Sequence, residues 1–319
     1  MTWTFFHWGV FSGVTAVVLL LDLFVFHQRD RVPTLRSSLL WTVFWVCLAM
    51  CFNGLIWYWG GKGPALEFLT GYLVEWSLSM DNVFVFAVVF GFFKIPLENQ
   101  YRVLFWGILG AIVMRLGFIF AGAELLKHFE WLMCVFGVSL VLSGIKLLRT
   151  KDEDVHPDQN WLMRLATKYL RVKHDEHPHR FFIHENGKWY ITPLFLVLLV
   201  IESTDVMFAI NSVPAIFGIT RDPFIVFTSN LSAILGLRAL YFLLAGVMGM
   251  IHYLSHGLSA ILIFVGLKMN LEYFIPHPEG SHLVTPGTSL TIIAGIIAAA
   301  VLASLVRNKL AAGRNEVPV

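Results

Sequence analysis

The sequence predicts an all-α, polytopic transmembrane bundle. Of its 319 residues, 57% are hydrophobic, 15% aromatic and only 14% charged, and the mean hydropathy is +0.71. Such a composition is typical of integral membrane proteins. A helix of about 20 apolar residues crosses the hydrocarbon of a bilayer, and the sequence contains about nine such runs. They cover approximately residues 5–26, 38–58, 66–92, 102–123, 130–148, 192–212, 223–248, 256–274 and 288–306.

Polarity along the chain predicts the domain organisation. One long polar segment separates two groups of apolar runs, and this divides the sequence into five parts. They are 1–62 with two N-terminal transmembrane helices, 63–148 with transmembrane repeat 1, 149–191 as a cytoplasmic loop, 192–274 with transmembrane repeat 2, and 275–319 with the last transmembrane helix and a cytoplasmic tail. The first apolar run is expected to be retained, because no basic segment precedes it and no small-residue cleavage site follows it.

The distribution of Lys and Arg predicts the orientation of the chain. With nine spans, the loops on one side carry most of these residues, and the loops on the other side have only Lys62, Lys127 and Arg221. By the positive-inside rule the N-terminus is outside and the C-terminus is cytoplasmic. The net charge of +2 does not indicate a nucleic-acid partner. The three cysteines lie in apolar spans and predict no disulfide framework.

The third to fifth spans resemble the sixth to eighth spans at an offset of about 123 residues. Three landmarks agree, and they pair Ser79-Met80-Asp81 with Ser203-Thr204-Asp205, Arg115 with Arg238, and Gly144-Ile145-Lys146 with Gly266-Leu267-Lys268. Two three-helix units in tandem enter the membrane from opposite sides, so the sequence predicts two inverted three-helix repeats. Such folds hold their substrate near the midplane, where the aspartates and arginines are expected. The two lysines are expected near opposite membrane surfaces.

Acidic residues inside the spans are the strongest sign of a functional site. Glu75, Asp81, Glu202 and Asp205 lie in apolar stretches, and a carboxylate at the centre of a transmembrane helix costs roughly 2.5–3.5 kcal/mol. Glu202 and Asp205 are spaced to share one helix face. Glu75 and Asp81 are not, so either their helix is interrupted or each acid faces a different neighbour.

Charge balance indicates that this site holds a cation. Together with the acid in the first span, the carboxylates outnumber the two buried arginines by about three charges, which protons or metal ions must balance. Carboxylate and amide oxygens are hard ligands that suit Mn²⁺, Ca²⁺ or Mg²⁺, and the sequence does not choose among these metals. The predicted metal ligands are Glu75, Asp81, Glu202, Asp205 and Asn211, and the predicted supporting residues are Asp22, Asn82, Asn230, Arg115 and Arg238.

Two other interpretations stay open at this point. Asp81 could pair with Arg115 and Asp205 with Arg238, as salt bridges that only hold the bundle together. Alternatively, the chain is a non-transporting scaffold, assembly or stress-response protein that acts through residues 149–191. An enzyme is not expected, because the spans contain no Ser-His or zinc motif, and no resident cofactor is expected.

The 149–191 loop is the only long polar segment. Its His- and Asp-rich parts fit a solvated linker, and a metal-collecting role stays open. Apolar residues at helical spacing between Trp161 and Val172 predict a short amphipathic helix on the membrane surface. The segment from Phe181 to Tyr190 predicts a β-hairpin with a type I′ turn at Asn186-Gly187.

Four long segments carry a resemblance to a known family. They are residues 75–83 (EWSLSMDNV), 181–194 (FFIHENGKWYITPL), 202–217 (ESTDVMFAINSVPAIF) and 222–246 (DPFIVFTSNLSAILGLRALYFLLAG). In these segments the chain resembles the TerC/Alx integral membrane proteins of the LysE-like transporter group, over nearly its whole length.

The resemblance implies a bacterial inner-membrane protein similar to Mn²⁺ exporters, in which Glu75, Asp81, Glu202 and Asp205 are needed for transport. It also implies export in exchange for protons. The predicted inverted repeats indicate that transport occurs by alternating access. Asn211 stands where relatives usually carry aspartate. Because asparagine keeps an oxygen ligand but removes a charge, we expect weaker cation binding or a changed coupling stoichiometry. The sequence gives no oligomeric state.

Overall fold

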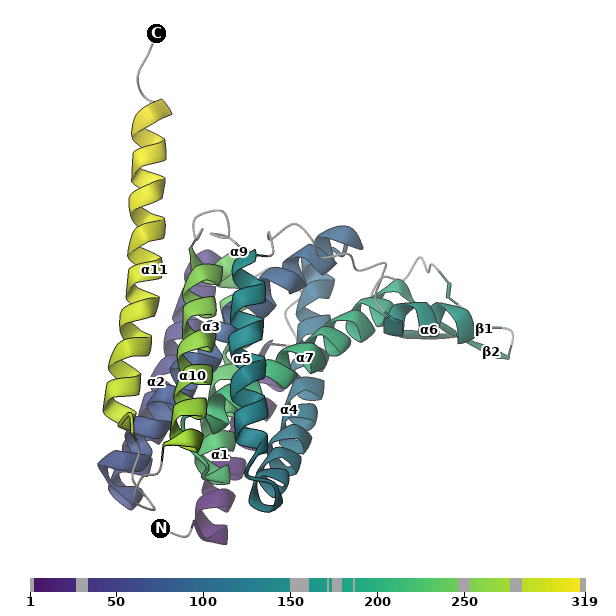
Figure 1. Cartoon of the computed structure of the whole chain (residues 1–319). Helices are drawn as coiled ribbons and strands as arrows, with labels where there is room; N and C mark the ends of the chain where they lie inside the picture. The colour runs from purple at the N-terminus through teal and green to yellow at the C-terminus, as the bar shows by residue number, and fades with distance from the viewer. Residues whose placement is uncertain are drawn as a thin grey trace.

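The computed structural model describes residues 3–26, 34–149, 161–170, 172–173, 180–185, 187–245, 253–275 and 283–315. In these ranges the chain is a helical bundle with one small hairpin (Figure 1). The helices are α1 (Phe5–Phe26), α2 (Leu35–Gly60), α3 (Lys62–Phe92), α4 (Leu97–His128), α5 (Leu132–Arg149), α6 (Trp161–Tyr169), α7 (Pro193–Phe217), α8 (Pro223–Leu235), α9 (Leu237–Ala245), α10 (Leu254–Phe274) and α11 (Pro286–Asn315). The strands are β1 (Phe182–Glu185) and β2 (Lys188–Ile191).

The prediction of a polytopic helical membrane protein is confirmed. Within the described ranges, 7 helices are long and apolar enough to cross a membrane, and the number is 8 if α8 and α9 together count as one span. The predicted span 223–248 is therefore not one straight helix, because α8 and α9 meet at an angle of 41°. The break falls at Gly236, where the backbone packs against Trp45 and an added Cβ would lie 3.2 Å from the Trp45 Cβ.

Several helices begin at side chains that cap free backbone N–H groups. The Thr192 hydroxyl accepts a hydrogen bond from the Phe195 N–H, and Pro193 takes the first position of α7. Asp222 caps α8 in the same way, with Pro223 next to it. Proline suits this position because the N–H that it lacks has no partner there. These local signals explain why α7 and α8 begin where they do.

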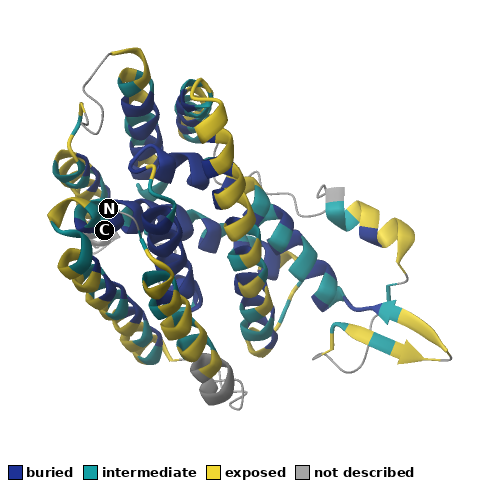
Figure 2. Ribbon diagram, turned by 90° about the horizontal axis from the view of Figure 1, so that it is seen from below, coloured by how far each residue is buried: buried dark blue, intermediate teal, exposed yellow. Residues whose placement is uncertain are grey.

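Burial is concentrated in the middle of the bundle (Figure 2). Every residue of α8 beyond Pro223 is buried, whereas the outer helices expose large apolar side chains. Examples are Phe44, Trp57, Val113 and Leu302. In a bilayer these side chains contact lipid, so their exposure is what a membrane-spanning bundle requires.

Helices α5 and α10 approach each other closely through small residues. A Cβ added to Gly266 would lie 2.5 Å from the carbonyl oxygen of Gly137, and one added to Gly144 would lie 2.9 Å from that of Ser259. Ser259 also donates a hydrogen bond to the Gly144 carbonyl. In the predicted repeat Gly144 corresponds to Gly266, and Gly137 corresponds to Ser259. The Gly137–Gly266 contact is therefore equivalent to the Ser259–Gly144 contact. The packing agrees with an inverted repeat, which stays a prediction.

The helix and the hairpin predicted in the 149–191 loop are both present. Helix α6 and the antiparallel pair β1–β2 project to one side of the bundle and adjoin the start of α7 (Figures 1 and 2). Gly187 has φ +70°, as a tight hairpin turn requires, whereas Asn186 and the His-rich segments lie outside the described residues. We call α6, β1 and β2 the lateral arm.

The first helix and the last helix point their free ends in opposite directions. Figure 1 shows the N-terminus at one end of the bundle and the C-terminus at the other. This placement fits an odd number of membrane crossings. Which end faces the cytoplasm stays a prediction based on the basic loops.

Candidate functional site

Helix α3 runs without interruption from Lys62 to Phe92. Of the two arrangements considered for Glu75 and Asp81, the interrupted helix is therefore wrong, and each acid faces a different neighbour. Glu75 is fully buried and faces α4 and α8. Asp81 is half-buried and faces a cavity that is also lined by α5 and α7.

Arg115 of α4 is the centre of a buried polar cluster. Its Nη1 donates hydrogen bonds to the Glu75 carboxylate, to Ser212 Oγ at 3.0 Å and to Asn230 Oδ1 at 3.2 Å. Its Nη2 lies 3.8 Å from Asp205 Oδ1. One guanidinium thus joins helices α3, α4, α7 and α8. We call these five residues the Arg115 cluster.

Two asparagines complete the polar contacts of the acids. Asn230 Nδ2 donates to Glu75 Oε2 at 3.0 Å, and Asn82 Nδ2 lies 3.5 Å from Asp205 Oδ1. Among the described residues, neither Asp205 Oδ2 nor Asn82 Oδ1 has a hydrogen-bond partner, although both atoms are buried. Buried acceptors without a partner are costly, so these two oxygens are available to a proton or a cation.

The sequence allowed two structural salt bridges, Asp81–Arg115 and Asp205–Arg238. Both pairings are wrong. Arg115 pairs with Glu75 and Asp205 rather than with Asp81, and Asp205 pairs with Arg115 rather than with Arg238. The Arg238 guanidinium lies 4.2 Å from the centre of the Tyr101 ring. The reason is that α4 packs along α7, so the arginine of one predicted repeat reaches the aspartate of the other.

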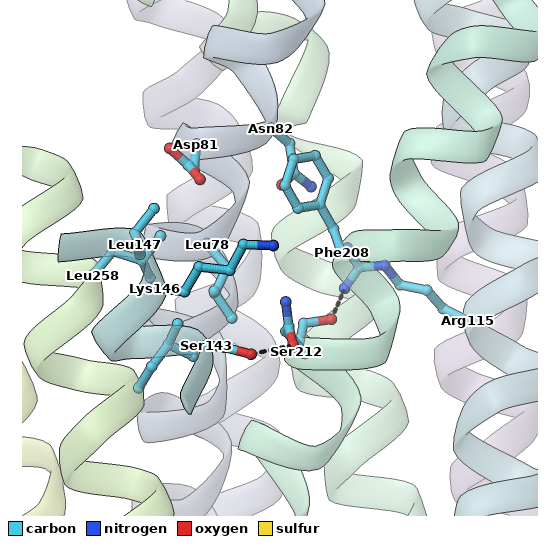
Figure 3. A pocket seen from close by; sticks show the side chains of 12 residues that line it. Leu78, Asp81, Asn82, Arg115, Ser143, Lys146, Leu147, Phe208, Ser212 and Leu258 are labelled. Carbon is cyan, nitrogen blue, oxygen red and sulfur yellow. Dashed lines mark hydrogen bonds between the residues drawn. The ribbon is translucent and has the colours of Figure 1, made fainter. Parts of the chain in front are cut away.

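A cavity of about 240 Å³ adjoins the Arg115 cluster. Its apolar wall includes Leu78, Phe208 and Leu258, and its polar lining comes from α3, α4, α5 and α7 (Figure 3). The polar residues are Asp81, Asn82, Arg115, Ser143, Lys146, Asn211 and Ser212. Within this lining Ser143 Oγ donates to Asn211 Oδ1 at 3.0 Å. The lining offers carboxylate, amide and hydroxyl oxygens from three helices, which are hard ligands for a cation.

Lys146 also lines this cavity, although the sequence predicted that it lies near a membrane surface. It lies about one turn before the end of α5, as expected near a membrane surface, but its side chain extends into the cavity (Figure 3). The sequence signal for Lys146 is a lysine within an apolar span, and its position near the span's end predicts an interfacial side chain. Its charge belongs to the site, so the predicted excess of negative charge is smaller by one.

The remaining predicted residues lie outside the cavity lining. Glu202 is half-buried and faces α4, where a Cβ on Gly110 would lie 2.5 Å from its carboxylate carbon. The Asp22 side chain is outside the described residues. In the part of the chain that the structure describes, no three His, Cys, Asp or Glu side chains gather as a metal-ligand group. Of the predicted carboxylates, Glu75 and Asp205 thus belong to the Arg115 cluster and Asp81 lines the cavity, whereas Glu202 belongs to neither site.

Comparison with known proteins identifies the family. The family model described as "Integral membrane protein TerC family" matches residues 60–311. The chain belongs to the TerC family. It is 45% identical to a Myxococcus xanthus protein named "Uncharacterized membrane protein STKORF319". The alignment spans 302 residues, which are 95% of this chain and 92% of that protein. No solved structure matches it.

Two other similar proteins carry a functional name. A Photorhabdus laumondii protein is 42% identical over 318 residues, and an Escherichia coli K12 protein is 41% identical over 299 residues. The alignments cover 97% of both the first protein and this chain, and 91% of both the second protein and this chain. Both relatives are named "Putative membrane-bound redox modulator Alx". The expected resemblance to TerC and Alx proteins is confirmed.

Proposed function

We propose that this TerC-family protein is a secondary transporter in the bacterial inner membrane that exports a divalent cation, Mn²⁺ in first place, in exchange for protons. The observation that carries this proposal is the cavity beside the Arg115 cluster. It brings Asp81, Asn82 and Asn211 together with two serine hydroxyls inside a membrane-spanning bundle. Such oxygen donors are the ligands that Mn²⁺, Ca²⁺ and Mg²⁺ prefer.

The position of the cavity supports loading from the predicted cytoplasmic side. Ser143, Lys146 and Leu147 belong to the last two turns of α5, which end on the same side of the bundle as the C-terminus (Figure 1). On the opposite side of the cavity lies the Arg115 cluster, whose hydrogen bonds tie four helices together. In the proposed cycle this conformation admits a cation to Asp81 from that side, and the Arg115 cluster blocks its further path. Release outside then requires the repeats to move relative to each other.

Proton exchange follows from charge. When a cation leaves, the Asp81 carboxylate stays inside the bilayer, where an uncompensated charge is costly. A proton bound to this carboxylate, or to the unpaired Asp205 oxygen, balances that charge on the return step. Cation and proton thus share the same oxygens, and this sharing is the basis of exchange.

Replacement of Asp81 tests the cation site. We expect Asp81→Asn to abolish most export, because the cavity loses its half-buried carboxylate. The measurement is total cellular Mn, Ca and Mg in a Mn-sensitive, exporter-deleted bacterium under Mn load, with membrane levels of each variant checked by immunoblot. Glu124→Gln is the matched control, since Glu124 is exposed and pairs with Lys127 on the surface.

The outcome also separates the metals. If wild type and Glu124→Gln lower cellular Mn and Asp81→Asn does not, the result supports Mn²⁺ export. If cellular Ca or Mg falls instead of Mn, that metal is the substrate. Wild-type export by Asp81→Asn at normal membrane levels contradicts the cavity as the site. If wild type lowers no metal, the transport proposal fails.

A second candidate function is a scaffold that acts through the lateral arm. It is favoured by exposed aromatic side chains on the arm, among them Tyr169, Phe182 and Trp189. Exposed aromatic residues are frequent at surfaces that bind partners or the membrane interface. This candidate predicts a function that survives loss of Asp81 and depends on the arm.

A further inference from the structure

A positively charged side chain lies within the cavity to which the proposed function assigns a cation. Lys146 extends from α5 into the space between Asp81 of α3 and Ser212 of α7 (Figure 3). An ammonium is a compact charge with three N–H donors, and the cavity lining presents carboxylate, amide and hydroxyl oxygens. The ammonium and a metal ion would therefore compete for the same oxygens.

The two cations of the cavity differ in the flexibility of their side chains. Arg115 is fixed by hydrogen bonds to Glu75, Ser212 and Asn230 on three other helices. Lys146 sits on a flexible four-carbon stem about one turn from the end of α5. A lysine in this position can swing its ammonium toward the membrane surface while its stem stays in apolar surroundings. Lys146 is thus the cation that can leave.

We propose that the Lys146 ammonium is a tethered counter-cation, which occupies the cavity oxygens when no metal is bound and is displaced by the transported cation. This inference rests on the proposed function. It gives the empty carrier a balanced charge at Asp81, which leaves the exchanged proton to the unpaired Asp205 oxygen. It also makes Lys146 a residue that determines specificity.

The specificity follows from charge and effective concentration. A monovalent ion such as Na⁺ or K⁺ has no charge advantage over an ammonium, and the ammonium is tethered at the site at an effective concentration of about millimolar or more. A divalent ion attracts the same carboxylate about twice as strongly at equal distance. The tethered lysine therefore excludes Na⁺ and K⁺ but yields to Mn²⁺.

Neutral replacement of Lys146 tests the inference. We expect Lys146→Met in the purified full-length protein to bind Mn²⁺ at least about tenfold more tightly than wild type, because no resident cation has to be displaced. We also expect high NaCl to weaken Mn²⁺ binding by the variant and not by wild type. Both are measured by calorimetric Mn²⁺ titration, at constant ionic strength with NaCl or a bulky organic salt.

Three further variants serve as controls. Lys146→Arg keeps the charge and should behave like wild type, and Lys127→Met removes an exposed surface lysine and should change nothing. Lys146→Gln is a neutral polar replacement that substitutes for Lys146→Met if the latter elutes as an aggregate in size-exclusion chromatography. Thermal unfolding of each variant shows whether its bundle is intact.

The possible results are distinguishable. If wild type binds Mn²⁺ and both neutral variants bind it with the same affinity and the same indifference to Na⁺, the tethered counter-cation is wrong and the proposed cation site stands. If neither wild type nor the neutral variants bind Mn²⁺, Ca²⁺ or Mg²⁺, the proposed function fails and this inference fails with it. Tighter binding by the neutral variants together with loss of discrimination against Na⁺ supports the inference.

Discussion

At the scale of single residues, Arg115 matters most for the architecture of the site. Its guanidinium is buried and bonds to side chains from three other helices. Arginine suits this role because its planar group presents five N–H donors in fixed directions. The sequence identified Arg115 as a counter-charge, and the structure shows that it serves Glu75 and Asp205 together.

Removing one partner of this buried ion pair should destabilise the protein. We expect Glu75→Gln to lower the free energy of unfolding by about 3 kcal/mol or more, because the buried guanidinium loses its closest opposite charge. Thermal unfolding of the purified protein in detergent measures the effect. Glu124→Gln, which breaks an exposed pair with Lys127, should cost less than about 1 kcal/mol. Equal melting temperatures for the two variants would contradict a structural role for the Arg115 cluster.

At the scale of elements, the close contact of α5 and α10 depends on glycine. The Gly137 carbonyl oxygen lies against Gly266, and the Gly144 backbone lies against Ser259. Small residues let transmembrane helices approach so closely that their backbones touch. The two contacts are equivalent under the predicted repeat. The α5–α10 pair is therefore a candidate interface between repeat 1 and repeat 2.

A methyl group at this contact should force the helices apart. We expect Gly266→Ala to lower the melting temperature by several degrees, because the new Cβ would meet the Gly137 carbonyl at 2.5 Å and the Leu140 Cβ at 3.0 Å. Gly117→Ala is the matched control, since no atom beyond its own helix lies within 4 Å of an added Cβ. That variant should be unchanged or slightly more stable. If both variants melt alike, α5 and α10 do not pack as described.

At the scale of the whole molecule, the candidate site lies in the bundle and the lateral arm lies beside it. Among the described residues, those that form the cavity and the Arg115 cluster belong to α3, α4, α5, α7, α8 and α10. The arm packs through Ala166 and Ile191 against Leu196 at the start of α7, and most of its surface is exposed (Figure 2). Transport and attachment to partners can therefore be tested independently.

Changes on the arm should leave transport intact. We expect the double variant Tyr169→Ser/Trp189→Ser to keep wild-type Mn export, because both side chains are exposed and neither lines the cavity. The measurement is cellular Mn content and growth under Mn load, beside wild type and Asp81→Asn. Loss of function in the arm variant with full function in Asp81→Asn would favour the scaffold over the transporter.

The sequence by itself determined the features that depend on residues close together along the chain. Apolar run length predicted the membrane class and most spans, helical spacing predicted α6, and Asn186-Gly187 predicted the hairpin. The acidic positions were found because a charge in an apolar span is costly.

The tertiary structure decided which of those residues meet. Asn230 bonds to Glu75 across 155 positions of sequence, and Asn82 reaches Asp205 across 123. Such contacts depend on how α3, α4, α7 and α8 pack, which spacing along one helix does not encode. For the same reason the Lys146 side chain was expected at a surface although it enters the cavity, and the possible partner of Arg115 was given as Asp81 although it is Glu75. Local sequence fixes where a helix lies in the chain, whereas the partner of each buried charge is fixed by the packing of distant helices.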